Sequence, residues 1–300
     1  MKAKIFTPAV TILNDNDTIN IDSNLAVADH LIAGGVDGMV PLGSTGEFTY
    51  FSLEDKKKYL SALSKKVAGK IELLPGVGGL HYRETVELAN HVIKLDAVRG
   101  VLIINEFYFN MSADDFYEYY SYMAEHIHGR VYVYNYPART GNSVDAGSLE
   151  KLVEKHKNIV GLKDSVLNFD HTGEIMKKIL PIRPDFEAFS GFDNQLLDNI
   201  ALGGAGSIGA LSNMAPKLWS SWIKANNEKN EAKIAEGKRR IDEMMAFYSL
   251  ESNPQKLIKE VLKKMGLPIS THCHFPYDRP LKRGSLEKAL DLIQKNDTEL

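Results

Sequence analysis

The chain has 300 residues, and its 36 lysines and arginines against 39 aspartates and glutamates give a formal net charge of -3 at pH 7. This balance excludes the broad basic face that a nucleic-acid or anionic-membrane partner requires. The single cysteine, Cys273, cannot form an internal disulfide and points to a reducing compartment, so we expect a cytoplasmic protein. No apolar run approaches the ~20 residues of a membrane span, and Pro8 interrupts the first residues before a signal-peptide core can form.

Short apolar runs that are typical of strands alternate with longer amphipathic stretches. The predicted strands are residues 4–8, 36–42, 71–76, 100–104, 131–135, 158–163, 186–191 and 206–208. Many of these runs are apolar without strict alternation, which indicates parallel strands that are covered on both faces.

The stretches between the strands have helical periodicity. The predicted helices are residues 24–33, 53–67, 82–95, 113–127, 148–155 and 194–201. Strand-then-helix units repeated eight times predict an α/β fold, a (β/α)8 TIM barrel formed by residues 1–225. A doubly wound open sheet uses the same units and is the alternative. The barrel is favoured because no linker or change in composition divides the chain into halves.

Beyond Pro216 the strand signals stop and helical patterns continue. These patterns cover residues 218–225, 231–248, 255–265 and 286–294. They predict a C-terminal helical extension, residues 226–300, that packs on the barrel rather than forming an independent domain.

The reacting groups of a (β/α)8 barrel come from the C-terminal ends of its strands. Lys163 ends the sixth predicted strand, after the apolar run 158–162. Burial there favours the neutral amine, a nucleophile that condenses with a ketone to form a Schiff base. The alternative is a lysine whose ammonium extends from the strand end into solvent.

Two further candidate groups lie at the same end of the predicted barrel. The turn Gly43-Ser44-Thr45-Gly46 places two hydroxyls between glycines, and its backbone N–H groups suit a carboxylate. The phenol of Tyr134, linked through Ser44 or Thr45 to a second phenol at Tyr108, could pass protons in both directions. The alternatives are an ordinary strand–helix turn and two half-buried aromatic side chains.

Three motifs receive a structural interpretation. Residues 204–209 match G-x-G-x-x-G but occur too late for a dinucleotide-binding unit, so we assign them to the eighth strand. Residues 76–79 lack the lysine and hydroxyl of a phosphate-binding loop and predict a tight turn. The run 272–274, His-Cys-His, has no suitably spaced partner ligands, so we expect no metal site.

Taken together, these residues resemble the dihydrodipicolinate synthase/N-acetylneuraminate lyase superfamily, whose members are Schiff-base lyases that handle pyruvate. The motifs that carry the resemblance are Thr7-Pro8, residues 43–47, Phe107-Tyr108, Tyr134-Asn135-Tyr136-Pro137, Gly161-Leu162-Lys163-Asp164, Ile258-Lys259-Glu260 and Gly266-Leu267-Pro268. Their order and spacing favour the catalytic interpretation of Lys163 over the solvent-facing one.

The resemblance implies a role for each candidate residue. Lys163 would attack the keto carbon of pyruvate or a 2-keto acid, Tyr134 would shuttle the proton, and Ser44 would relay it. Thr45 would bind the pyruvate carboxylate with help from backbone N–H groups of the turn that begins at Gly43, and the carbonyl of Ile208 would face the same site.

The resemblance also implies partners and cofactors. Tyr108 matches a tyrosine that reaches into the site of a neighbouring subunit, so we expect a homodimer or homotetramer. No metal or organic cofactor is implied, because the iminium formed on the lysine serves as the electron sink. The substrate is expected to be a small keto acid.

The residues point to two different branches of the family. Ser44-Thr45, Glu106 and Phe109 depart from the synthase pattern, and residues 267–272 resemble the 2-keto-3-deoxygluconate aldolase branch. Arg139, in contrast, matches the synthases' arginine for the carboxylate of the aldehyde substrate, although it could also lie at the surface or bind an acid sugar. We predict cleavage of a 2-keto-3-deoxy sugar acid to pyruvate and an aldehyde.

The alternatives within the family are a 4-hydroxy-tetrahydrodipicolinate synthase, which condenses pyruvate with aspartate semialdehyde, and an N-acetylneuraminate lyase. Two alternatives come from other classes, a metal-dependent barrel lyase and a non-catalytic sugar-acid binding protein. The second of these has no need of a nucleophile such as Lys163.

Overall fold

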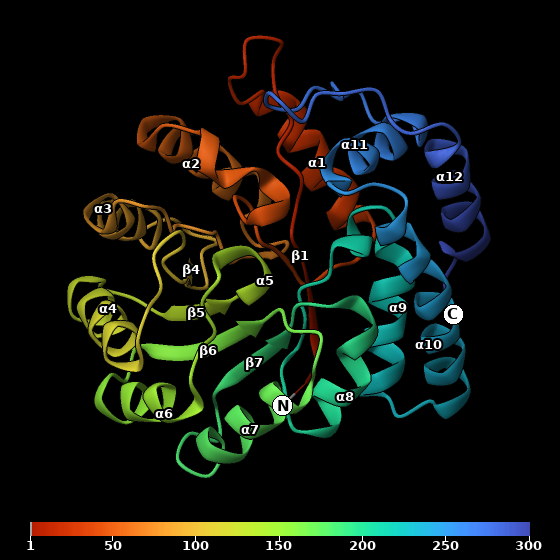
Figure 1. Ribbon diagram of the computed structural model, residues 1–300. Coiled ribbons are helices and arrows are strands. Elements are labelled where there is room, and N and C mark those ends of the chain that lie inside the picture. Colours follow the sequence, from red (N-terminus) through yellow and green to blue (C-terminus); the bar gives the residue numbers. More distant parts are fainter. Residues whose placement is uncertain (1) are drawn as a thin grey trace.

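The computed structural model describes residues 2–300 and contains one parallel sheet of eight strands with helices around it (Figure 1). The strands are β1 (Lys4–Thr7), β2 (Gly38–Met39), β3 (Glu72–Leu73), β4 (Val101–Ile104), β5 (Val131–Asn135), β6 (Ile159–Asp164), β7 (Glu187–Ser190) and β8 (Gly206–Ser207). Each lies within or overlaps a predicted strand, which confirms the strand pattern read from the sequence.

The sheet closes into a barrel, which decides against the doubly wound alternative. Its strand order is β3-β2-β1-β8-β7-β6-β5-β4, so the first strand pairs with the last. Between β3 and β4 the closure consists of two isolated parallel bridges, Leu73 with Val98 and Gly76 with Leu102. The predicted (β/α)8 barrel is therefore confirmed.

Helices cover the outside of the barrel. They are α1 (Ile21–Ala33), α2 (Leu53–Val67), α3 (Tyr82–Val92), α4 (Ala113–His126), α6 (Ala146–Lys155), α7 (Asp170–Ile179), α8 (Leu196–Ala201) and α9 (Pro216–Asn227). The short α5 (Pro137–Thr140) lies instead over the C-terminal end of the barrel, directly after β5 (Figure 1). No predicted helix corresponds to α5 or α7. Several helices begin at a side-chain cap, as at Ser112, whose hydroxyl and the carboxylate of Asp115 form a capping box.

Because strands lie between a filled interior and a helical layer, both of their faces are buried. Every residue of β4, β5, β6 and β7 is buried, as the non-alternating apolar runs predict. Gly161 in β6 is required by this packing, because an added Cβ would lie 2.4 Å from the ring of Tyr132.

A network of charged side chains fills the N-terminal end of the barrel. Glu187 accepts hydrogen bonds from Arg99, Arg130 and Tyr132. Arg99 also donates to Glu72 at 2.8 Å. This end of the barrel is closed by mutually paired groups, which leaves the opposite end for binding.

The C-terminal extension consists of α10 (Glu231–Met244), α11 (Pro254–Lys264) and α12 (Ser285–Asn296). Helix α10 packs on α9 and α12, and α11 packs on α12 and on the 3-10 turn η1 (Ser44–Gly46) of the barrel. The predicted division after residue 225 stays a prediction, and α9 spans that position. Among residues 2–300, no helix is long and apolar enough to cross a membrane.

Candidate active site

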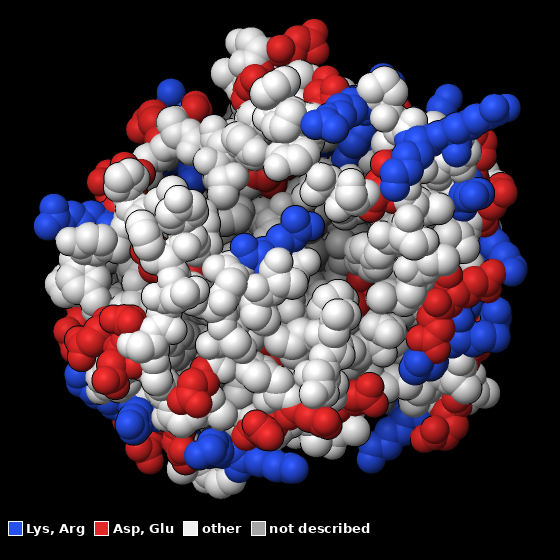
Figure 2. Space-filling model, viewed as in Figure 1, with Lys and Arg blue, Asp and Glu red and all other residues white. Residues whose placement is uncertain are grey.

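A cavity of about 650 Å³ lies at the C-terminal ends of the strands. Figure 2 shows the hollow near the centre of this face, with most charged side chains around the periphery. Its wall includes Tyr134 of β5, Lys163 of β6, Gly191 after β7 and Ile208 after β8. Residues from four successive strands, far apart in the sequence, thus meet at one end of the barrel, as the barrel topology requires.

Lys163 lies at the inner wall of this cavity. It is 5% exposed, and the strand register places it beside Tyr134 on β5 and Phe189 on β7. Its Nζ is 4.3 Å from the centroid of the Tyr134 ring. Lys163 is therefore almost wholly removed from bulk solvent, and desolvation is one of the conditions that activate a lysine nucleophile.

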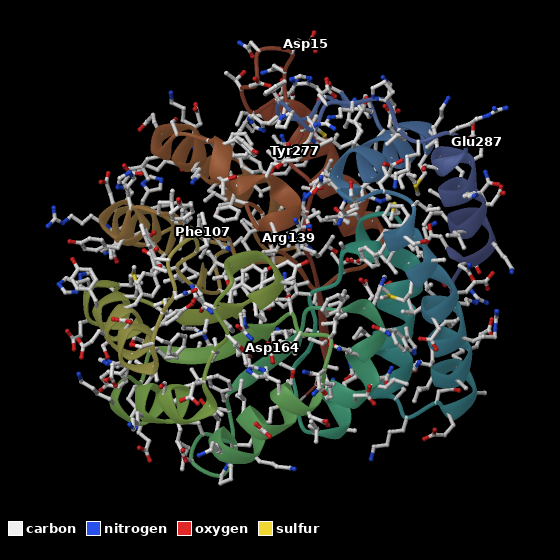
Figure 3. The ribbon with its side chains drawn as sticks, viewed as in Figure 1. Asp15, Phe107, Arg139, Asp164, Tyr277 and Glu287 are labelled. Carbon is white, nitrogen blue, oxygen red and sulfur yellow. The ribbon has the colours of Figure 1, made fainter. Side chains whose placement is uncertain are left out.

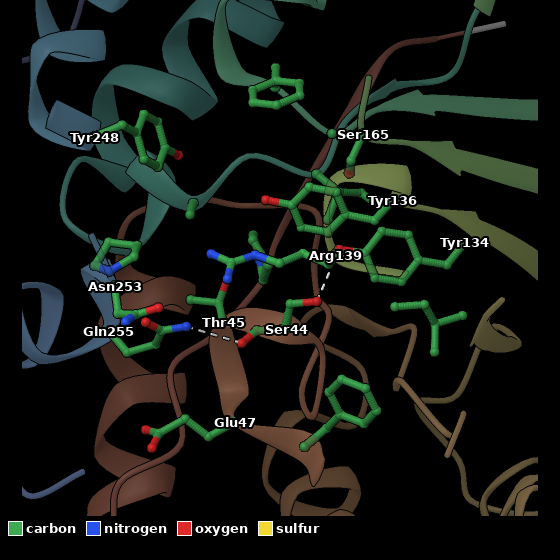
Figure 4. Close-up of a pocket in the computed structure, with 18 of the residues that line it drawn as sticks. Ser44, Thr45, Glu47, Tyr134, Tyr136, Arg139, Ser165, Tyr248, Asn253 and Gln255 are labelled. Atoms are coloured by element: carbon green, nitrogen blue, oxygen red, sulfur yellow. Dashed lines mark hydrogen bonds between the residues drawn. The ribbon is translucent and has the colours of Figure 1, made fainter. Parts of the chain in front are cut away.

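The turn after β2 brings hydroxyl groups to the same wall. The Ser44 Oγ is 3.3 Å from the hydroxyl oxygen of Tyr134, and Thr45 also lines the cavity (Figure 4). Gly43, the first residue of this turn, directly precedes the 3-10 segment Ser44–Gly46. The turn lies close to the end of β3, where a Cβ on Gly76 would be 2.3 Å from the carbonyl oxygen of Leu42.

Two other predicted site residues, Arg139 and Tyr108, lie away from the inner wall that Lys163 forms. Arg139, on α5, points into the mouth of the cavity, and its guanidinium lies 6.0 Å from the ring centroid of Tyr136 (Figures 3 and 4). Tyr108 is 87% exposed, packs edge-on against Phe109, and is not among the residues that line the cavity. Within one chain, the predicted phenol relay therefore contains Tyr134 and Ser44 but not Tyr108.

Tyr108 also has an unusual backbone conformation. Its φ of 88° lies in the left-handed region, which costs a non-glycine residue about 1–3 kcal/mol. Asn142, whose Nδ2 donates to the carbonyls of Glu106 and Phe109, holds this loop in place. The loop therefore presents two aromatic rings to the outside of the molecule.

The sequence had not indicated Tyr248, which lines the cavity, or Asp193, a buried carboxyl to which it is bonded. The Tyr248 hydroxyl donates to Asp193, a fully buried carboxyl that also accepts the backbone N–H of Leu211 at 3.2 Å. Burial raises the pKa of Asp193 to about 6 and that of Tyr248 well above 10. Because the Tyr248 proton is donated to Asp193, its oxygen is left as an acceptor on the cavity wall.

The extension supplies the rest of the wall. Asn253 and Gln255 lie at the start of α11, and the Nε2 of Gln255 donates to the carbonyl of Ser44 at 3.3 Å (Figure 4). The sequence signal that could have indicated their role was the position of these polar residues at the start of a strongly amphipathic helix. Residues from the extension are thus part of the candidate site.

The His-Cys-His run lies close to this wall, and its histidines pair with carboxylates. His272 lies between Asp17, at 2.7 Å, and Asp278, at 2.9 Å, while His274 contacts Glu47 at 3.3 Å. Among residues 2–300, no group of three or more His, Cys, Asp or Glu side chains is placed to hold a metal ion.

Comparison with known proteins identifies the relatives of this chain. Residues 1–295 match the model of the dihydrodipicolinate synthetase family. The chain is 31% identical over 281 residues to the putative 2-dehydro-3-deoxy-D-gluconate aldolase YagE of Escherichia coli K12, covering 93% of each chain. It is 31% identical over 269 residues to the probable 2-dehydro-3-deoxy-D-pentonate aldolase YjhH of the same organism, covering 90% of this chain and 89% of the other.

A solved structure agrees with these sequence matches. The crystal structure of YagE from E. coli K12 in complex with pyruvate superposes with a TM-score of 0.91 and 29% sequence identity, covering 98% of both chains. A 4-hydroxy-tetrahydrodipicolinate synthase of Kosmotoga olearia is 30% identical over 220 residues, covering 73% of this chain and 74% of the other. Both aldolases and synthases are therefore among the relatives.

Proposed function

Because this chain belongs to the dihydrodipicolinate synthetase family, and is thus a lyase that forms a lysine Schiff base with pyruvate, we propose that Lys163 is its nucleophile. We propose further that it cleaves a 2-keto-3-deoxy sugar acid to pyruvate and an aldehyde. The observation that carries the assignment of Lys163 is its Nζ on the ring of Tyr134, whose hydroxyl is within 3.3 Å of Ser44.

In the proposed reaction, Nζ of Lys163 bonds to C2 of the keto acid and the carbonyl oxygen leaves as water. Tyr134 takes the proton of the C4 hydroxyl while the electron pair of the C3–C4 bond moves toward the iminium, and the aldehyde departs. The resulting enamine is protonated at C3, and hydrolysis then returns pyruvate and the free amine. Ser44 relays the proton, while Thr45 and the backbone N–H groups of its turn hold the carboxylate.

Two lines of support favour a sugar-acid substrate. YagE and YjhH carry the names of 2-dehydro-3-deoxy sugar acid aldolases. Beside the charged side chains of Glu251 and Lys256, the cavity also extends from Lys163 to neutral hydrogen-bonding groups, those of Tyr248, Asn253 and Gln255. Such groups suit the hydroxyls of a polyol chain better than an ionised group.

The second candidate is a 4-hydroxy-tetrahydrodipicolinate synthase, and Arg139 is the observation that favours it. Its guanidinium points into the mouth of the cavity, where it would form charge-assisted hydrogen bonds with the carboxylate of an aldehyde substrate. An N-acetylneuraminate lyase is a third candidate from the same family, supported only by the general architecture of the site.

The assembly is also part of the proposal. The exposed rings of Tyr108 and Phe109 support a homodimer or homotetramer in which this loop contacts a second subunit. Sedimentation measurements on the wild type and on Tyr108→Ala would test this point, and a wild type that stays monomeric at micromolar concentration would contradict it.

The chemistry is tested by trapping the adduct. Incubation with pyruvate and borohydride should add the mass of the reduced adduct to the peptide that holds Lys163. Lys163→Ala should abolish the adduct, while Lys157→Ala, at an exposed position six residues earlier, should leave it unchanged. A wild type without adduct, or turnover that survives Lys163→Ala, would contradict the assignment.

The substrate is tested by a separate assay. Pyruvate release is measured over a panel of 2-keto-3-deoxy sugar acids and N-acetylneuraminate, and condensation is measured with pyruvate and aspartate semialdehyde. The proposal expects the largest kcat/KM on a sugar acid. A larger value in the condensation assay would favour the synthase.

A further inference from the structure

The turn that carries Ser44 and Thr45 ends at a buried carboxylate that the proposed reaction does not use. Glu47 is 7% exposed and has a left-handed backbone, with φ 55°. Its Oε1 accepts from Nζ of Lys259 at 2.6 Å, and its Oε2 lies 3.1 Å from the backbone nitrogen and 3.3 Å from Nδ1 of His274. These donors all come from the C-terminal extension.

Lys259 is itself fully buried, although it is a lysine on a helix near the molecular surface. It lies on α11 among the buried side chains of Ile258 and Leu262, and its Nζ donates to the carbonyl of His272 at 2.8 Å as well as to Glu47. A buried ion pair adds little net stability compared with apolar side chains of the same size. Stability alone therefore does not account for this pair.

A second contact from the same helix reaches the other end of the turn. Gln255 lies four residues, about one helical turn, before Lys259, and its Nε2 donates to the carbonyl of Ser44 at 3.3 Å. Helix α11 is thus bonded to the turn at Ser44 and at Glu47, on both sides of Thr45. These contacts fix the position of the turn relative to the barrel.

The position of the turn matters because the hydrogen bond between Ser44 and Tyr134 cannot lengthen further without breaking. The 3.3 Å between Ser44 and Tyr134 is already beyond the usual range for an O–H···O bond, about 2.5–3.0 Å. A small outward movement of the turn would break this bond and would also displace the N–H groups around Thr45. A misplacement of about 1 Å at a reacting centre can cost on the order of 10²-fold in rate.

We propose that Lys259, through Glu47 and together with Gln255, is a positioning residue that holds the catalytic turn at the distance Schiff-base chemistry requires. This inference rests on the proposed role of Ser44 and Thr45. It makes the C-terminal extension a functional part of the active site, since loss of its contacts changes the reaction even where the barrel remains folded.

The experiment measures pyruvate trapping by borohydride in the wild type, Lys259→Met, Glu47→Gln and Gln255→Leu. Trapping needs only pyruvate, so it does not depend on which aldehyde or sugar acid is the true substrate. The matched control is Glu187→Gln, which removes a buried carboxylate from the ion-pair network at the opposite end of the barrel. Thermal unfolding is measured for every variant, and trapping is measured well below the lowest Tm.

Lys259→Met should slow trapping at saturating pyruvate by roughly 10- to 100-fold. Glu47→Gln and Gln255→Leu should slow it less, while Glu187→Gln should keep the wild-type rate within about twofold despite a lower Tm. A folded Lys259→Met with the wild-type rate and half-saturation would overturn the inference. If Lys259→Met does not fold, a wild-type rate in both Glu47→Gln and Gln255→Leu would overturn it equally.

The two proposals fail in distinguishable ways. If trapping slows equally in Lys259→Met and Glu187→Gln, the effect follows stability and the positioning role is wrong. If the wild type and Glu187→Gln both lack an adduct, the proposed nucleophile is wrong and the positioning role is rejected with it.

Discussion

The hydroxyl of Ser44 is expected to affect the reaction far more than the fold. Ser44 is half-buried, and its contact with Tyr134 at 3.3 Å is too long to contribute more than about 1 kcal/mol to the free energy of unfolding. A proton relay, in contrast, contributes about 10²- to 10⁴-fold to the rate. Taking the lower end, because the bond is long, Ser44→Ala should lose about 2.7 kcal/mol of transition-state stabilisation.

The assay compares kcat for pyruvate release with Tm in Ser44→Ala, Tyr134→Phe and the double variant. We expect kcat to fall about 100-fold in Ser44→Ala, with a Tm within a few degrees of the wild type. In the proposed relay the two hydroxyls act as one unit, so the double variant should be no slower than the slower single variant by more than about threefold. Independent, multiplying losses would refute the relay, and so would a Ser44→Ala enzyme with wild-type kcat.

Three further predictions follow from single side chains. His171 lies 2.9 Å from Asp164 and 2.8 Å from the carbonyl of Val144, and the bond to Asp164 raises its pKa above 6.5. The stabilisation of the fold by protonated His171 is complete below pH 6.5 and is lost as pH rises through the raised pKa. His171→Gln should therefore lower Tm more near pH 5.5 than near pH 9. An equal loss of Tm at the two pH values would contradict this. Burial raises the pKa of Asp193 from 3.8 to about 6, so its stabilising neutral form is lost as pH rises through about 6. Above that pH the ionised carboxylate lowers the free energy of unfolding by about 3 kcal/mol. Asp193→Asn should therefore raise Tm near pH 8 but not near pH 3.5. A Tm that Asp193→Asn leaves unchanged at pH 8 would show that the pKa of Asp193 is ordinary. Arg139→Ala should keep the rate of pyruvate trapping but lower kcat/KM for an aldehyde with a carboxylate by about 30-fold, or roughly 2 kcal/mol. Equal losses with neutral aldehydes would reject the carboxylate role.

The architecture was predictable because continuous apolar runs without alternation are typical of strands that are buried on both faces. The run at 158–163 became β6, in which every residue is buried, and Lys163 stands near its C-terminal end as expected. Strand lengths were predicted less well. The predicted strands 36–42 and 71–76 are longer than the observed β2 and β3, which have two residues each. Both predicted ranges contain a proline beyond the observed strand, Pro41 and Pro75, and proline has no N–H to donate to a sheet.

The candidate site was predictable only where its residues lie at strand ends. Tyr134 and Lys163 are register partners on neighbouring strands, so a barrel brings them together without further information. Glu47 and Lys259 are 212 positions apart and meet only because α11 packs on the turn. Neither composition nor periodicity encodes such a meeting, although a lysine among the apolar positions of a helix is a signal of a buried partner.

The cationic side chains at the two ends of the barrel have different partners, and this difference concerns Lys163. At the N-terminal end, Arg99 donates to Glu72 and Glu187, so its donors are committed to carboxylates. At the C-terminal end, Nζ of Lys163 lies over the ring of Tyr134, and a ring face attracts an ammonium without accepting a conventional hydrogen bond from it. Glu47, the carboxylate that directly follows the turn of Ser44 and Thr45, is paired with Lys259. The extension thus supplies a counter-charge for Glu47 from outside the barrel, and under the proposed function this leaves the amine of Lys163 available to the substrate.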